Sequence, residues 1–112
     1  MRGQEERREQ LVEEIRTAER ARDLLAGLER RLNERDRSDL EEHLGRLDQL
    51  AESLPEDHSV GLLIDSAVKA ATTRDAGYAA SAASRSRSKS EGRLSWLRGS
   101  LSRLDAFAGM NA

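Results

Sequence analysis

Two histidines are the side chains in this sequence best suited to acid–base or metal chemistry near neutral pH. His43 lies four residues after Asp39 and borders a leucine stripe, where a metal ligand or a general base at a helix seam would be placed. The metal motif of helical bundles needs a glutamate three residues before the histidine, and position 40 is a leucine. We therefore expect His43 to flank a seam with its polar edge in water. His58 lies in a polar segment, residues 56–59, that predicts a helix-capping turn.

Nucleophilic and phosphate-transfer chemistry lack their usual signatures. The chain has no cysteine, and no serine lies in a Gly-x-Ser-x-Gly turn. The glycines are scattered singly, so the sequence contains no glycine-rich phosphate loop. Carboxylate pairs such as Glu13 with Glu14 belong to charged helix faces, where solvated ions are expected. We therefore predict that the protein is not an enzyme and holds no cofactor or metal.

An arginine–serine segment over residues 84–92 is the low-complexity feature with a functional candidate. Its cations and those that follow could neutralise phosphates of DNA or RNA, namely Arg85, Arg87, Lys89, Arg93 and Arg98. Trp96 could then stack on a base. The competing interpretation is a solvated connection beside an ordinary core tryptophan, because the whole chain has a net charge of −2 and few aromatic rings.

Charge is distributed unevenly along the chain. Residues 38–75 hold three basic and nine acidic side chains, whereas residues 76–112 hold six basic and two acidic ones. The acidic middle and the basic tail could attract one another, within one chain or between copies.

Three runs of leucine and other apolar residues, spaced three or four residues apart, predict the helices that position these side chains. The first helix is predicted at about residues 5–33 and the second at 38–54. Ser38 is expected to begin the second helix through a capping box with Glu41. The short polar break between the helices favours an antiparallel hairpin whose two stripes face each other.

The rest of the chain predicts two further helices separated by a connection. Apolar positions from Val60 predict a third helix over residues 60–75, after Pro55 has ended the second. Residues 76–92 are rich in alanine, serine and arginine, and we expect a connection there, either flexible or extending the third helix. The last leucines predict an amphipathic helix over residues 93–109.

The expected architecture is therefore an all-α, small helical bundle with coiled-coil-like seams, built from an antiparallel hairpin and two further helices. Its domain plan is a three-helix core over residues 1–75 (the hairpin 5–54 plus helix 60–75), then the connection and the C-terminal helix. With only 3% aromatic residues, the core must consist of thin aliphatic seams. No run is long enough to span a membrane, and the first ten residues lack the apolar segment of a signal peptide, so we expect a cytoplasmic protein.

Leucine stripes that need covering predict a non-catalytic interaction protein, a subunit or adaptor of a larger assembly or a homo-oligomer. The C-terminal helix is the expected partner surface because aromatic anchors dominate interface energetics. Its predicted partner-binding residues are Leu94, Trp96, Leu97, Leu101, Leu104 and Phe107. This hypothesis predicts that Leu97→Asp abolishes assembly and leaves the hairpin intact. The alternative is a nucleic-acid-associated accessory subunit that uses the Arg/Ser-rich region.

Overall fold

The computed structural model describes residues 2–110, which form four α-helices and no strand. The helices are α1 (Arg2–Asn33), α2 (Leu40–Glu52), α3 (Ser59–Thr73) and α4 (Ala76–Met110). The all-α prediction and the antiparallel hairpin of α1 and α2 are confirmed.

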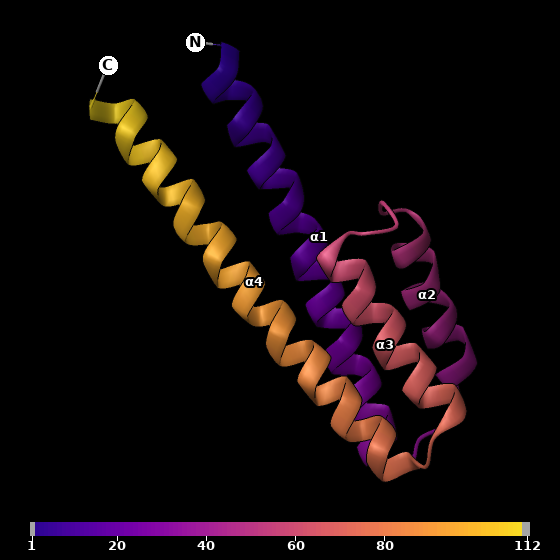
Figure 1. The fold of residues 1–112 in the computed structure, drawn as a ribbon. Coiled ribbons are helices and arrows are strands. Elements are labelled where there is room, and N and C mark those ends of the chain that lie inside the picture. Colours follow the sequence, from indigo (N-terminus) through magenta and orange to yellow (C-terminus); the bar gives the residue numbers. More distant parts are fainter. Residues whose placement is uncertain (1, 111–112) are drawn as a thin grey trace.

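Two long helices, α1 and α4, run antiparallel along the whole molecule (Figure 1). At a rise of about 1.5 Å per residue each is about 50 Å long. That length matches the longest dimension of the molecule, which measures 54 × 21 × 21 Å. The beginning of α1 and the end of α4 therefore lie at the same tip (Figure 1).

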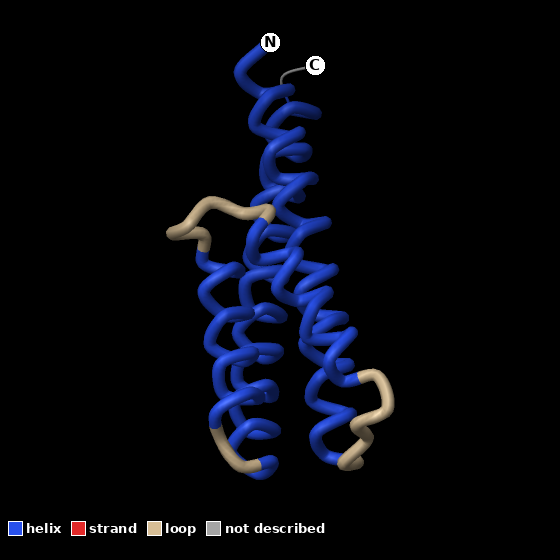
Figure 2. The backbone as a smooth tube through the Cα atoms, turned by 90° about the vertical axis from the view of Figure 1, so that its right-hand side faces the viewer, coloured by secondary structure: helices blue, strands red, loops and turns tan. Residues whose placement is uncertain are grey.

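The shorter helices α2 and α3 pack against only one half of this pair, as Figure 2 shows. In that half, which we call the bundle half, α2 packs on α1 and α3, and α3 packs on α4. Its buried core is aliphatic and combines large with small side chains: Ala21, Leu25, Leu28, Leu32, Leu47, Val60, Ile64, Ala67, Ala79 and Ala83.

Among the described residues, the other half contains only α1 and α4, and we call it the stalk (residues 2–18 and 93–110) (Figure 2). Its buried core is a separate, smaller cluster of Leu11, Ile15, Ala18, Leu94 and Leu97. A two-helix seam covers one stripe on each helix and leaves the flanks of both helices in solvent.

Residues 76–92 form the first half of α4, so the prediction of a connection between two helices is wrong. The buried face of this stretch consists of small side chains, which do not form a recognisable hydrophobic stripe in the sequence. Ala79, Ala82, Ala83, Ser86 and Ser90 are all buried. The two serine hydroxyls are satisfied by backbone carbonyls, Ser86 Oγ donating to Leu63 O (3.0 Å) and Ser90 Oγ to Arg87 O (2.7 Å). Small residues allow the backbones of neighbouring helices to approach closely, which is why α4 packs without large side chains here.

The start of α2 also differs from the prediction. Asp39, not Ser38, is the N-cap residue, and its side chain makes no capping hydrogen bond within the described chain. The hydroxyl and backbone N–H of Ser38 instead donate to Asp36 (2.7 and 3.1 Å), so the capping box with Glu41 is absent. The chain can bring the Asp36 carboxylate to Ser38 because Arg35, just after the end of α1, has a left-handed backbone conformation with a φ of 56°.

Candidate functional site

The six predicted partner-binding residues divide into three groups by exposure. Leu94 and Leu97 are 2% and 1% exposed, because they fill the seam between α4 and α1. Leu101 and Leu104 are half-buried and pack against the same seam. Trp96 and Phe107, by contrast, are 52% and 54% exposed. The leucine stripe is therefore covered within the chain, and the two rings are the parts that reach the surface.

A groove of about 450 Å³ lies between α1 and α4 beside the indole of Trp96. The Arg93 guanidinium stacks over that indole, with 4.9 Å from Cζ to the ring centroid. Arg93 Nε is buried and has no hydrogen-bond partner in the described part of the chain. Both charge signs line the groove, and the full set of lining residues is Arg7, Gln10, Leu11, Glu13, Glu14, Arg93, Trp96 and Leu97.

His58 ties this groove to the bundle half. Its Nδ1 accepts a hydrogen bond from the backbone N–H of Val60 (3.1 Å), which makes His58 itself the N-cap of α3. The proton therefore lies on Nε2, which donates to the Glu14 carboxylate at 3.0 and 3.1 Å. The predicted capping turn is present, but the capping group is the imidazole and not one of its acidic or hydroxyl neighbours.

The predicted nucleic-acid residues do not share one surface. Arg87 bonds Glu29 of α1 and Glu91, and Arg98 pairs with Glu19 at 3.6 Å. Arg93 stacks on Trp96 in the groove. The remaining two, Arg85 and Lys89, are exposed and make no ion pair with another described residue.

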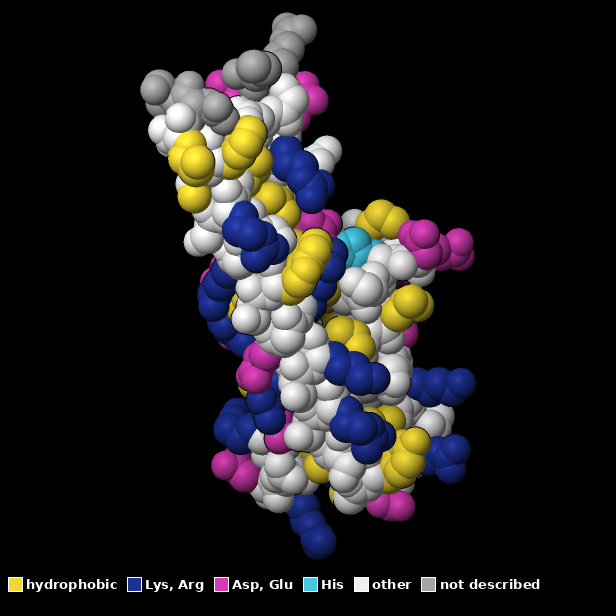
Figure 3. Space-filling model, turned by 60° about the vertical axis from the view of Figure 1, so that its left-hand side comes forward, with side chains coloured by type: hydrophobic (Ala, Val, Ile, Leu, Met, Phe, Trp, Pro, Cys, Tyr) yellow, Lys and Arg dark blue, Asp and Glu magenta, His cyan; other side chains and the backbone are white. Residues whose placement is uncertain are grey.

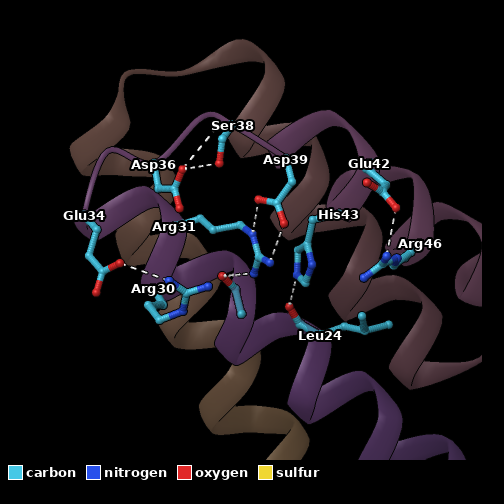
Figure 4. Close-up of polar contacts among 11 residues, drawn as sticks. Leu24, Arg30, Arg31, Glu34, Asp36, Ser38, Asp39, Glu42, His43 and Arg46 are labelled. Carbon is cyan, nitrogen blue, oxygen red and sulfur yellow. Dashed lines mark hydrogen bonds and ion pairs between the residues drawn. The ribbon is translucent and has the colours of Figure 1, made fainter.

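His43 belongs to a polar cluster that joins α2 to α1 (Figure 4). Arg31 donates to both carboxylate oxygens of Asp39, from Nε and Nη2 at 2.8 Å each, and from Nη1 to Gly27 O at 3.0 Å. The Arg31 guanidinium lowers the pKa of Asp39 to about 2. His43 Nε2 lies 2.6 Å from the carbonyl oxygen of Leu24, so this nitrogen carries the proton and donates.

The imidazole of His43 is buried, contrary to the expectation of a polar edge in water. Its Nδ1 has no hydrogen-bond partner within residues 2–110. Burial lowers the pKa of His43 because desolvation disfavours the imidazolium. The ring fits against α1 only because position 27 is glycine: a Cβ there would lie 2.8 Å from His43 Cε1.

Neither histidine has the surroundings that metal chemistry needs. Within the described chain, no group of three or more His, Cys, Asp or Glu side chains is placed to hold a metal ion. Over the same residues, no helix combines the length and the apolar character required to cross a bilayer.

A cluster that the sequence analysis missed lies where α3 ends and α4 begins. The guanidinium carbons of Arg74 and Arg85 lie 5.3 and 5.9 Å from the centre of the Tyr78 ring. Tyr78 and Arg85 are seven residues apart, two turns on one helix face. The spacing was visible in the sequence and became meaningful only once residues 76–92 proved helical.

Comparison of the chain with protein-family models, curated proteins and solved structures finds no significant match.

Proposed function

We propose that this protein is a non-catalytic helical interaction protein, a subunit or adaptor that assembles through its stalk. The observation that carries the proposal is the exposed Trp96 beside the groove, on a helix pair that lacks the covering helices present in the bundle half.

The groove lies on the side of the α1–α4 pair that α3 covers in the bundle half. Glu14 lines the groove and bonds His58 at the first turn of α3. Arg93 is seven residues after Ser86, whose hydroxyl bonds Leu63 of α3, and a step of seven keeps residues on one helix face. An added helix on this side of the stalk would therefore continue the packing that α3 begins.

The occupant that fits this surface best is the stalk of a second copy. A twofold axis places one surface against itself, so each copy must carry both members of every complementary pair. The groove does so, because Arg7 and Arg93 lie beside Glu13 and Glu14. Such charges fix orientation, and the partly exposed indole supplies apolar area for burial.

The expected dimer is weak and depends on concentration. The stalk is about 25 Å long and two helices of about 10 Å diameter wide, so each copy offers about 500 Å². The total of about 1,000 Å² lies at the lower limit for specific interfaces.

Sedimentation velocity over a concentration series tests this proposal. We expect the wild type to shift from monomer to dimer, and Trp96→Ala to remain a monomer. Tyr78→Ala is the matched control, because Tyr78 is a comparably exposed ring (49%) in the bundle half, and it should dimerise as the wild type does. A wild type that stays monomeric throughout the series would contradict the proposal, as would equal weakening by both substitutions.

Leu97→Asp does not provide a clean test of assembly. Leu97 is 1% exposed in the seam, so a carboxylate there would destabilise the stalk itself, with or without a partner.

A further inference from the structure

A small hollow of about 170 Å³ opens on the surface where α3 meets the start of α4. Its lining is polar and basic: Ser66, Lys69, Ala70, Thr73, Arg74 and Tyr78. Since one water occupies about 30 Å³ in the liquid, the hollow has room for a phosphate group and a few waters. On the lower part of the face in Figure 3, basic side chains lie around apolar ones, with acidic side chains at the edge of the group.

The ring of Tyr78 contacts two arginines, of which Arg74 also lines the hollow and Arg85 reaches the ring from α4. The ring is about half exposed, and the guanidinium carbons of Arg74 and Arg85 lie within 6 Å of its centroid. These two arginines come from different elements, Arg74 from the end of α3 and Arg85 from α4. Cation–π contact with the Tyr78 ring restricts both arginine side chains. The contact leaves the N–H donors, which point outward in the plane of each guanidinium, available to a ligand.

The cations at the hollow and along the adjoining stretch of α4 lack anionic partners, whereas eight other arginines of the described chain form ion pairs. Lys69, Arg74, Arg85 and Lys89 make no ion pair with any residue between 2 and 110. The acidic neighbour in sequence, Asp75, uses Oδ1 to accept from the backbone N–H of Tyr78 and so caps α4. Asp75 keeps its negative charge when it caps α4, so the four cations and this one carboxylate together leave a net positive charge on a protein whose net charge is −2.

We infer that this surface binds the phosphate groups of a nucleic-acid strand, an activity beyond the assembly proposed for the stalk. An arginine guanidinium can donate two parallel hydrogen bonds to the oxygens of one phosphate, and it can do the same with a carboxylate of an acidic peptide. An aromatic partner would not need these donors. The series of unpaired cations continues along α4 from Arg85 to Lys89, one helical turn further. Cations that follow one another in this way favour a polymer of phosphates over a single anion.

Fluorescence anisotropy with a labelled oligothymidylate strand tests the inference. If the wild type neutralises four phosphates, its affinity should fall about 50-fold between about 50 and about 200 mM salt. The double variant Arg74→Ala/Arg85→Ala should bind more weakly at low salt and lose only about 7-fold over the same range, because two contacts remain.

The matched control is Arg20→Ala/Arg37→Ala, which removes the same charge from exposed arginines elsewhere and should follow the wild type. Circular dichroism of both double variants checks that helix content is kept, and Arg74→Lys/Arg85→Lys, which keeps the charge, should retain part of the affinity.

Unlabelled oligothymidylate, inorganic phosphate and polyglutamate serve as competitors. The inference predicts that the oligonucleotide competes best. It is overturned if the wild type does not bind the strand at low salt, if the two alanine double variants lose affinity equally, or if inorganic phosphate or polyglutamate displaces the strand as well as the oligonucleotide does.

Discussion

His43 is the residue whose surroundings most constrain the junction of α1 and α2. Burial of an imidazole with one nitrogen bound to a helix carbonyl and the other unpartnered favours its neutral form. The leucine spacing correctly placed this residue beside a seam. Its burial could not be predicted, because the ring enters a gap that exists only where Gly27 of another helix removes a side chain.

The lowered pKa of His43 predicts that stability decreases in mild acid. In the unfolded chain the imidazole takes up its proton near the ordinary histidine pKa of about 6.5, while the folded chain resists protonation to lower pH. The unfolded state thus holds more protons below about pH 6.5, and stability falls as pH decreases through this window. Urea unfolding at about pH 8 and about pH 5 should show a larger loss for the wild type than for His43→Leu.

The difference between the two proteins isolates His43, because His58 and the carboxylates are common to both. Equal losses in the wild type and in His43→Leu would contradict the assignment.

Gly27 and Gly45 predict opposite effects of the same substitution. Alanine in a helix interior is normally about 1 kcal/mol more favourable than glycine, and Gly45→Ala should show this gain because nothing lies within 4 Å of its added Cβ. Gly27→Ala should instead be destabilising, since its Cβ would lie 2.8 Å from His43 and 2.9 Å from Arg31. Midpoints of thermal unfolding measure both. A stabilising Gly27→Ala would show that the imidazole can leave its site without cost.

At the scale of elements, the leucine stripes predicted α1, α2 and α3 within a few residues, because large apolar side chains mark their buried faces. The first half of α4 escaped prediction for the converse reason. Its buried face consists of alanine and serine, which also occur in flexible connections, and most of its charged residues are exposed. Only the three-dimensional fit against α1 and α3 distinguishes the two cases.

Substitutions of two serines separate the buried from the exposed face of α4. Ser90 is completely buried, so Ser90→Leu should destabilise the protein by about 1–3 kcal/mol through overpacking. Ser88 lies on the exposed face, and Ser88→Leu should change stability by less than about 0.5 kcal/mol. Urea unfolding of both variants provides the comparison. Similar losses would mean that residues 84–92 do not pack as a helix.

At the scale of the whole molecule, the candidate surfaces lie in different halves of the helix pair. The groove with Trp96 belongs to the stalk, and the basic hollow belongs to the bundle half. The sequence predicted the aromatic residues of the first surface and two of the cations of the second, Arg85 and Lys89. The sequence could not show that the leucine stripe of α4 is covered within the chain, because this depends on which helix the stripe packs against.

The antiparallel course of α1 and α4 determines how the molecule responds to mechanical load. The beginning of α1 and the end of α4 lie at the same tip, farthest from the four-helix region. Tension applied across these two points pulls the two helices apart from that tip. The contacts of the seam are then loaded one pair after another and not all at once. We therefore expect the stalk, with its smaller core, to open turn by turn at lower force than the bundle half.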